Sequence, residues 1–412
     1  MNKKIYPCIL GLGYVGLPVF LRLNKKFRTT GFDTNKNRVT SLTKKIDTNK
    51  EVPKSLLTLK NKSYFTYNKN NLKKCNFFIV TVPTPLKNKN IPDLKFLIKA
   101  TQIISKHLKK NDIIVYESTV YPGTTQMLVK SILEKKSKFR ENKDFFVGYS
   151  PERVNPGDKE HSIEKISKIL AVKTKNKKIK KRILTIYNQV SKKIHITDSL
   201  EDAETAKVIE NIQRDLNIAL MNDIYIFSKK MKLDFNNIIK LASTKWNFLK
   251  FSPGLVGGHC LPVDPHYLNF IAKKNNIKLR TVLAGRDVNF DMKKFILKEI
   301  DQRIRKIKRL KKKIKILVVG VTYKKNVSDL RNSLALEIYY ELKKRYNQTK
   351  AFDEVCSKDV VSAIGLIKKI NYKKNNYDLT VFLVDHNKNK IIFNKMLKNK
   401  SNIYDPFGFH KV

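Results

Sequence analysis

A glycine-rich turn close to the N-terminus constrains the fold more than any other stretch of this sequence. An apolar run from Ile5 to Leu10 leads into GLGYVG at residues 11–16, a helical pattern covers Leu17 to Lys26, and a second apolar run ends at Asp33. In such a unit the first glycine makes the turn, the second lets a pyrophosphate approach the helix N-terminus, and the third lets helix and strand pack closely. An acid about 20 residues further on binds the adenosine ribose and favours NAD over NADP. We therefore predict a dinucleotide-binding βαβ unit, in which NAD contacts Gly11, Gly13, Tyr14, Val15, Gly16, Asp33 and Arg38.

Three more apolar runs, each followed by polar residues, predict further strands of the same parallel sheet. Ligands of such sheets bind beyond the carboxyl ends of the strands, where Thr84, Ser118 and Thr119 lie. These hydroxyls could line the cofactor site, or Ser118 could cap a helix. Glu152 follows the last run, where a glutamate can act as a base on water or form an ordinary surface ion pair. The predicted strands are Asn76 to Val82, Asp112 to Glu117 and Phe145 to Tyr149.

The stretch from Glu201 to Lys230 has the pattern of one long helix. Lys207, Asn211 and Arg214 are spaced i, i+4 and i+7, so they share one helix face. That face could simply be solvated, or its ammonium, amide and guanidinium groups could bind a sugar phosphate. The apolar face is broad enough to pack against a domain or a second subunit, and we expect a homodimer or larger homo-oligomer.

One cysteine lies in a stiff loop. Cys260 ends the sequence VGGHC at residues 256–260, prolines flank it, and Asp264 follows four residues later. Glycines let the backbone approach a ligand, and prolines restrict the neighbouring turns. Cys260 could be a small buried hydrophobe, or a nucleophilic thiol that the nearby carboxylate orients or helps to activate.

The last hundred residues have the pattern of a second, smaller α/β domain. Strands are expected at Ile314 to Gly320, near Ala351 and at Leu379 to Val384, and helices at Leu334 to Tyr346 and Asp359 to Lys368. Since no GxGxxG occurs there, we expect substrate contacts and not a second dinucleotide. The predicted fold is α/β, with two Rossmann-like doubly wound domains joined by a long central helix and a helical region. The predicted domains are residues 1–198 (NAD-binding), 199–312 (central, with the cysteine loop) and 313–412 (nucleotide-sugar-binding).

The composition narrows the class of protein. The net charge is +51, but the lysines are spread along the whole chain, as a biased genome composition would also produce. A basic nucleic-acid-binding protein is therefore the weaker alternative, and we expect no specific nucleic-acid partner. No apolar run has the length of a membrane span, and the first residues lead straight into a strand, so a signal peptide is not indicated. Four scattered cysteines without a CxxC pair indicate neither a zinc site nor a disulfide framework and suit a reducing cytoplasm.

Taken in order, these motifs resemble those of the nucleotide-sugar 6-dehydrogenases, the family of UDP-glucose and GDP-mannose dehydrogenases. The similarity covers nearly the whole chain. The sequences of its motifs are most similar to those of the branch that acts on UDP-N-acetylglucosamine or UDP-N-acetylgalactosamine. It rests on GLGYVGLP, TVPTPL, ESTVYPGTT, SPERVNPG, AKVIENIQRDLNIALMND, TKWNFLKFSPGLVGGHC with VDP, and GVTYKKNVSDLRNS. The resemblance implies that a C6 alcohol is oxidised twice, with two NAD and one water consumed, to give a uronate for surface polysaccharide.

The resemblance also assigns roles to individual residues. Cys260 would add to the C6 aldehyde to form a thiohemiacetal and then a thioester. Lys207 and Asn211 would stabilise the oxyanion, and Asp264 would orient water or support Lys207 and Cys260. Glu152 would act as the base for hydrolysis, and Thr119 would help to hold the water. The remaining assignments are Arg153, Val154, Arg214, Gly257 and Lys324 at the substrate, and Thr84 and Arg331 at the cofactor.

Three departures from the family pattern bear on the identity of the substrate. Ser252 replaces an arginine that could grip the substrate, Leu261-Pro262 replaces an isoleucine-glycine pair, and Leu334 replaces a proline. UDP-glucose 6-dehydrogenase is the nearest alternative, and a simple hydroxyacid dehydrogenase of the same fold is a more distant one. The first would be separated by the sugar nucleotide that reduces NAD, and the second by releasing one NADH per substrate.

Overall fold

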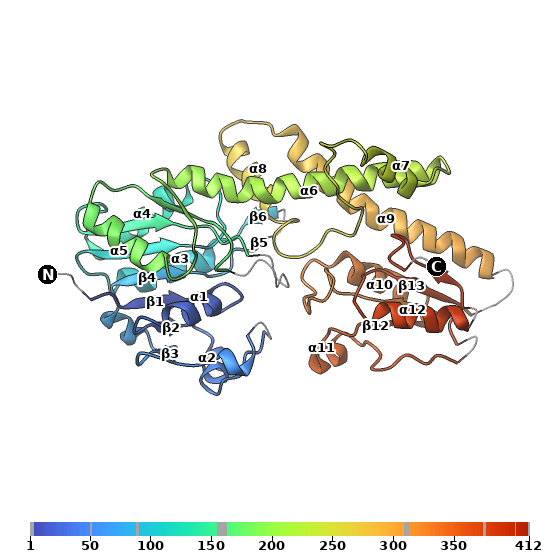
Figure 1. Cartoon of the computed structure of the whole chain (residues 1–412), viewed down its shortest axis with the longest axis horizontal. Helices are drawn as coiled ribbons and strands as arrows, with labels where there is room; N and C mark the ends of the chain where they lie inside the picture. Colours follow the sequence, from blue (N-terminus) through green and yellow to red (C-terminus); the bar gives the residue numbers. More distant parts are fainter. Residues whose placement is uncertain are drawn as a thin grey trace. The chain divides into compact units, whose positions relative to one another are not determined.

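The computed structural model describes residues 4–49, 52–87, 90–154, 163–308, 313–373, 376–399 and 401–410. The chain forms two compact units, the first comprising Met1–Glu210 with His266–Ile277 and the second comprising Asn211–Pro265 with Lys278–Val412. Each unit contains one largely or wholly parallel sheet with helices packed on it (Figure 1). The predicted α/β fold with two Rossmann-like domains is confirmed.

The sheet of the first unit has eight strands in the order β10-β9-β8-β7-β4-β1-β2-β3. Neighbouring strands are parallel except β8 and β9, which are antiparallel. The strand order reverses between β1 and β4, which is where parallel sheets of this kind bind their ligands. The strands are β1 (Pro7–Leu10), β2 (Thr30–Phe32), β3 (Tyr64–Thr66), β4 (Phe77–Val80), β7 (Asp112–Tyr116), β8 (Phe145–Tyr149), β9 (Lys168–Val172) and β10 (Ile194–Thr197).

Alternate residues of these strands face opposite sides of the sheet. Ile9, Ile79 and Val115 pack with the apolar faces of α1 and α5 in one buried cluster. Pro7 cannot donate a ladder hydrogen bond, and it is tolerated in central strand β1 because it is the first residue of that strand. The helices of this unit are α1 (Gly16–Leu23), α2 (Lys36–Thr43), α3 (Lys95–Ser105), α4 (Lys130–Ser137) and α5 (Lys177–Tyr187), and a short hairpin joins β5 (Leu86–Lys87) to β6 (Ile91–Pro92).

The second unit contains a four-stranded parallel sheet in the order β12-β11-β13-β14. One face packs on α10 and α9, and the other on α12. The strands are β11 (Ile316–Val319), β12 (Thr349–Phe352), β13 (Leu379–Phe382) and β14 (Ile403–Tyr404), and the helices over them are α10 (Leu334–Arg345), α11 (Lys358–Ala363) and α12 (Asn389–Lys398). Strand β14 forms one edge of this sheet.

Long helices dominate the middle of the chain: α6 (Leu200–Lys230), α7 (Phe235–Ala242), α8 (Asp264–Lys274) and α9 (Arg280–Lys308). Within the second unit α6 and α9 pack closely, since a Cβ on Gly285 would lie 2.7 Å from the side chain of Leu216. An ion pair between Arg286 and the buried Asp215 joins the same two helices. None of the helices in the described ranges is both long and apolar enough to cross a membrane.

One predicted helix of the last domain ends earlier than its pattern indicates. The predicted helix from Asp359 to Lys368 ends at Ala363, because Gly365 adopts φ +70° and the amide of Leu366 bonds back to the carbonyl of Val361. In the central region, residues 199–312, the last helix begins at Arg280, and residues 309–312 lie outside the described residues.

Candidate active site

The turn after β1 places its three glycines as the motif predicts. Gly11 has φ +96°, a conformation that favours glycine. A Cβ on Gly16 would overlap the carbonyl oxygen of Gly11, whereas a Cβ on Gly13 would meet no described atom within 4 Å. No side chain in the described structure caps the N-terminus of α1, and the N-terminal end of a helix favours an anion. This open turn beside a helix N-terminus fits the pyrophosphate of NAD.

Asp33, at the end of β2, is bonded to the same turn. One carboxylate oxygen accepts from the amide of Leu12 at 2.9 Å, and the other accepts from the amide of Asn35 at 2.9 Å. A carboxylate has further lone pairs, so Asp33 can still accept from a ribose hydroxyl. Asp33 is thereby held at the place that the motif predicts.

Arg38 is buried beneath this turn. Its Nε donates to the carbonyl of Leu12 at 2.8 Å, and another guanidinium nitrogen donates to Asp47 at 2.6 Å and to Thr48. Through these bonds Arg38 stabilises the glycine turn. A direct contact between Arg38 and the cofactor stays a prediction.

The strand ends beyond β4 and β7 meet, as a parallel sheet requires. The hydroxyl of Thr84 donates to the carbonyl of Thr119 at 2.7 Å, and the hydroxyl of Ser118 donates to the carbonyl of Val82 at 2.7 Å. Neither hydroxyl caps a helix, which removes the alternative role for Ser118. Thr84 and Thr119 are therefore neighbours at the edge of the sheet where the cofactor is expected.

Glu152, three residues beyond β8, is almost fully buried. Its Oε1 accepts from the amides of Arg153 and Val154 at 2.8 and 2.7 Å, and its Oε2 lies 3.1 Å from the Nζ of Lys168. Burial acts to raise the pKa of Glu152, but Lys168 and the two amides lower it below its usual value. The guanidinium of Arg153 bonds to Glu210 and to the carbonyl of Ser167.

Lys168 and Glu117 were missed at the level of sequence. Lys168 opens β9, and its Nζ is 2.7 Å from Glu117, which directly follows β7. Burial raises the pKa of Glu117, and the nearby Glu152 adds to this effect. The signal in the sequence that could have indicated this pair is that each residue is charged and lies at the end of an otherwise apolar strand.

In the second unit, Cys260 lies in the turn that leads into α8. Its carbonyl accepts from the amides of Val263 and Asp264 at 3.0 and 2.9 Å. Asp264 is buried, and its carboxylate accepts from the side-chain amide of Asn211 on α6 at 2.5 Å. The predicted nucleophile, carboxylate and amide therefore belong to one local structure, in which the thiol of Cys260 is half-buried.

The glycines before Cys260 pack against the loop that follows β11. A Cβ on Gly257 would lie 2.5 Å from the carbonyl oxygen of Asn332, and one on Gly258 would lie 2.7 Å from the ring of Tyr323. The amide of Gly258 bonds to the carbonyl of Arg331, and the side chain of Asn332 bonds back to Gly258. Only glycine allows this close approach, which joins the cysteine loop to the segment that contains Lys324 and Arg331.

Arg331 is half-exposed and held by Asp329. Two of its guanidinium nitrogens contact that carboxylate, at 2.6 and 3.0 Å. Although burial opposes this, Arg331 lowers the pKa of Asp329, and His259 contributes at 3.8 Å. The guanidinium of Arg331 thus has a fixed direction and an exposed edge.

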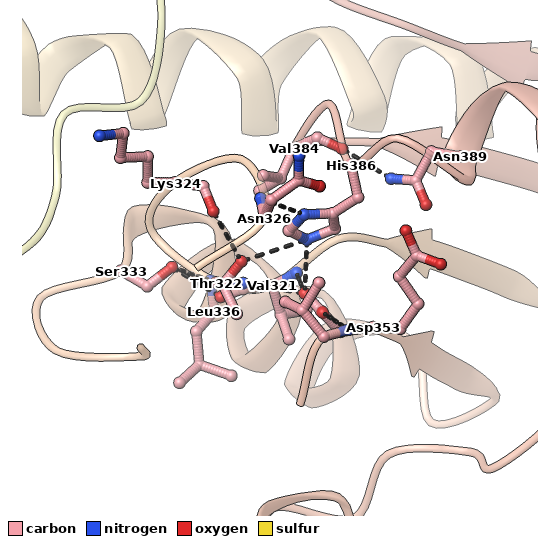
Figure 2. Close-up of polar contacts among 12 residues, drawn as sticks. Val321, Thr322, Lys324, Asn326, Ser333, Leu336, Asp353, Val384, His386 and Asn389 are labelled. Atoms are coloured by element: carbon pink, nitrogen blue, oxygen red, sulfur yellow. Dashed lines mark hydrogen bonds and ion pairs between the residues drawn. The ribbon is translucent and has the colours of Figure 1, made fainter. Parts of the chain in front are cut away.

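Lys324 lies at the rim of a buried polar network (Figure 2). His386 Nδ1 accepts from the amide of Asn326 at 3.0 Å, and His386 Nε2 lies 3.1 Å from Asp353 and 3.2 Å from the hydroxyl of Thr322. The bond from Asn326 requires an acceptor at Nδ1, so the proton of the neutral ring is on Nε2. Figure 2 shows the ammonium of Lys324 pointing away from this network.

The three polar residues predicted on one face of α6 have different environments. Lys207 and Asn211 are buried, whereas Arg214 is exposed. Lys207 and Asn211 are one helical turn apart, so their polar groups project in similar directions. The contribution of Arg214 to substrate binding stays a prediction.

Family models match three consecutive segments of the chain. They describe the NAD binding domain of the UDP-glucose/GDP-mannose dehydrogenase family at residues 4–191, its central domain at 201–291 and its UDP binding domain at 317–411. Together with the glycine turn and Asp33, these matches define the class: an NAD-dependent oxidoreductase that acts on a nucleotide sugar. The chain belongs to the UDP-glucose/GDP-mannose dehydrogenase family.

Named relatives cover almost the entire chain. UDP-N-acetyl-D-glucosamine 6-dehydrogenase of Pseudomonas aeruginosa is 41% identical over 94% of this chain and 92% of its own length. The enzyme of the same name from Salmonella typhi is 38% identical over 96% of this chain and 94% of its own length. Among solved structures, the UDP-D-ManNAc dehydrogenase of Pyrococcus horikoshii has a TM-score of 0.82 at 27% identity, and the match covers 94% of this chain and 90% of that one.

Proposed function

We propose that this protein oxidises the C6 hydroxyl of a UDP-N-acetylhexosamine twice, to the carboxylate, through a thiohemiacetal and a thioester of Cys260. The observation that carries the proposal is the local structure around Cys260, Asp264 and Asn211, which packs through Gly257 and Gly258 on the loop of Lys324. NAD, when bound at the glycine turn, supplies the acceptor for one hydride in each oxidation.

The side chains divide the remaining work. The thiolate of Cys260 bonds to the aldehyde carbon, and the aldehyde oxygen becomes an oxyanion that Asn211 and Lys207 stabilise. Asp264 accepts one N–H of Asn211 and so aims the amide, whose second N–H can donate to that oxygen. After the second hydride has left, a water held by Thr119 and deprotonated by Glu152 attacks the thioester, and the thiolate leaves.

The residues that bind the substrate are proposed from the family resemblance. Lys324 is proposed to contact the phosphates of UDP, Arg153, Val154 and Arg214 to contact the sugar nucleotide, and Arg331 to reach the cofactor. Gly257 would admit the substrate to the cysteine loop. We further propose domain boundaries at residues 198/199 and 312/313, and a uronate product used for surface polysaccharide.

The named relatives support an N-acetylated sugar. The two relatives named for UDP-N-acetyl-D-glucosamine are 41% and 38% identical, whereas those named for UDP-N-acetyl-D-mannosamine are 29–34% identical. UDP-glucose 6-dehydrogenase is the second candidate, since Ser252 stands where the family pattern has an arginine that could grip the substrate.

The test measures NADH released per mole of limiting sugar nucleotide. UDP-N-acetylglucosamine, UDP-N-acetylgalactosamine and UDP-glucose are each supplied to wild type, Cys260→Ala and Cys356→Ala. We expect two NADH from an N-acetylated sugar, loss of turnover in Cys260→Ala, and two NADH from Cys356→Ala, because Cys356 is half-buried like Cys260 but belongs to no proposed site.

Each other outcome corrects a different part of the proposal. Two NADH from UDP-glucose alone would keep the chemistry and refute the N-acetylated branch. One NADH per sugar, unaffected by Cys260→Ala, would refute the thioester route.

A homodimer or larger homo-oligomer is also part of the proposal. The second unit exposes large apolar side chains along α6, α7 and the following loop, and Trp246 is 92% exposed. Leu220 and Phe227 are spaced so that they share one face of α6, and the exposed Met231 directly follows this helix. Exposed apolar side chains in this number support an interface with a second copy of the chain. Light scattering should show a dimer or larger species in wild type and a monomer in Phe227→Glu with Trp246→Glu.

A further inference from the structure

A charged triad is buried at the carboxyl edge of the first sheet. The Nζ of Lys168 lies 2.7 Å from Glu117 and 3.1 Å from Glu152, and Lys168 is only 1% exposed. The phenol of Tyr187 on α5 donates to the second oxygen of Glu117 at 2.7 Å. Three side chains, from the segments that follow β7 and β8 and from α5, therefore surround the ammonium group of Lys168 in β9.

Such a triad does not arise from the needs of stability alone. Removing ions from water is costly, and replacing a buried ion pair with apolar residues is often neutral or stabilising. The strands on either side are packed with apolar residues, so the sheet would accommodate an apolar residue here as well. Glu152, the residue assigned as the base, is one member of the triad, so the buried charges can act on that base.

We propose that Lys168, itself held by Glu117 and Tyr187, is a positioning residue that keeps the Glu152 carboxylate ionised and fixes its direction during hydrolysis of the Cys260 thioester. The inference rests on the proposed function, because Glu152 is the base assigned to that step. It adds residues that touch neither the substrate nor the cofactor.

The contacts of Glu152 explain why Lys168 has this effect. Its Oε1 is fixed by two backbone amides, and Lys168 is the cation that fixes Oε2. Besides Lys168 and Glu117, the titratable groups near Glu152 are Tyr187 and Arg153, and the guanidinium of Arg153 is directed at Glu210 and at the carbonyl of Ser167. Lys168 acts to lower the pKa of both carboxyl groups. The pKa of Glu152 lies below its usual value, whereas burial and the charge of Glu152 leave the pKa of Glu117 raised.

The test is the pH profile of thioester hydrolysis in single turnovers of the full-length enzyme. Acid quenching and mass spectrometry follow the acyl adduct on Cys260 in wild type, Lys168→Met, Lys168→Arg and the double variant Lys168→Met with Glu117→Gln. In Lys168→Met the acidic limb of the pH profile of hydrolysis should shift to higher pH by about one to three units. The reason is that Glu152 loses its neighbouring cation and keeps the repulsion of Glu117. The limb of the double variant should lie between those of wild type and Lys168→Met, and Lys168→Arg should restore most of the shift.

KM for the sugar nucleotide and the rate of the first hydride step should stay within about twofold of wild type, whereas a general loss of structure would change both. Should Lys168→Met not fold, the double variant carries the test, because it leaves no carboxylate at residue 117. An acidic limb at the wild-type position in Lys168→Met, or in the double variant if Lys168→Met does not fold, overturns the inference.

Glu152→Gln separates this inference from the proposed function. If Glu152→Gln accumulates the adduct while the Lys168 variants keep the wild-type limb, only the inference fails. If Glu152→Gln hydrolyses the adduct at the wild-type rate, the assignment of Glu152 as the base is refuted, and the inference is refuted with it.

Discussion

The turns after β1 and β11 occupy the same position in two similar sheets, yet one is open and the other is filled. Gly11 and Gly320 have φ +96° and +85°, and in both cases a Cβ would press on the backbone just beyond the neighbouring strand, at Thr81 and Val384. Two residues later the turns diverge. The first has Gly13 with open space above it, whereas the second has Thr322, whose hydroxyl contacts His386.

The acids that follow the second strand of each sheet diverge in the same way. Asp33 bonds to two backbone amides and stays partly exposed, so it retains capacity for a ligand. Asp353 is buried, and it accepts from the amides of Val321, Thr322 and Val355 and contacts His386. One topology thus serves two purposes: the first turn admits a dinucleotide, while the second is closed internally and presents Lys324 outward from its loop (Figure 2).

The largest effect is expected at the third glycine of the open turn. In Gly16→Ala the Cβ would overlap the backbone of Gly11, so we expect a loss of about 3 kcal/mol or more in the free energy of unfolding. The matched control is Lys325→Ala, five residues after Gly320 as Gly16 is five after Gly11; it removes an exposed ion pair with Asp385 and should change stability by under about 1 kcal/mol. Urea denaturation measures both. Equal stability changes would show that close helix packing at the first turn is unnecessary.

Exchanging the two acids for alanine should separate fold from binding. Asp353→Ala leaves buried amides and His386 without their acceptor, so we expect a loss of about 3 kcal/mol in stability. Asp33→Ala should lose only about 1 kcal/mol, since its surroundings admit water, but should weaken NAD binding at least about tenfold. Denaturation and calorimetric titration with NAD provide the two measurements. The comparison is broken if Asp33→Ala is the less stable variant, or if it binds NAD as tightly as wild type.

Local sequence signals predicted the open turn well and the closed turn poorly. The first turn depends on glycine at three fixed positions, and glycine is visible in the sequence because the backbone geometry requires it. The closed turn depends on side chains that meet only in the fold, since Asp353 and His386 are 33 residues apart. The missing GxGxxG argued against a second dinucleotide, but no short-range pattern indicated that Asp353 is buried against His386.

The candidate site shows the same division. Cys260, Gly257 and Asp264 lie within one stretch, and the glycines and prolines of that stretch make the loop recognisable from its sequence. Lys168 and Glu117 are 51 residues apart and were not predicted, because a charged residue beside a strand is ordinarily exposed. The contact of Arg38 with the cofactor stays a prediction, and its observed partners are the carbonyl of Leu12 and the carboxylate of Asp47.

A methyl group at the second glycine should sharpen the contrast between stability and binding. Gly13→Ala meets open space, and Gly13 does not have positive φ, so stability should be unchanged or raised by about 0.5 kcal/mol. The same methyl group lies where a pyrophosphate must approach, and NAD affinity should fall about tenfold. Fluorescence titration with NAD and thermal denaturation test the two halves. Unchanged NAD affinity would mean that the open space above Gly13 is not the route of the pyrophosphate.

The smallest effect concerns the pH dependence of the closed turn. Burial alone would raise the pKa of Asp353, but His386 and the backbone amides lower it below its usual value. A carboxyl group whose folded pKa is depressed adds stability above its unfolded pKa, about 3.9, and this contribution is lost as pH falls through the folded value. Asp353→Asn keeps the shape but not the charge, so it should be about 1–2 kcal/mol less stable than wild type from pH 7 to pH 5. Urea denaturation at pH 7, 5, 4 and 3.5 should show the two proteins converging below pH 4. A gap that stays constant to the lowest pH would show that the hydrogen-bond geometry of Asp353, and not its charge, holds the second turn closed.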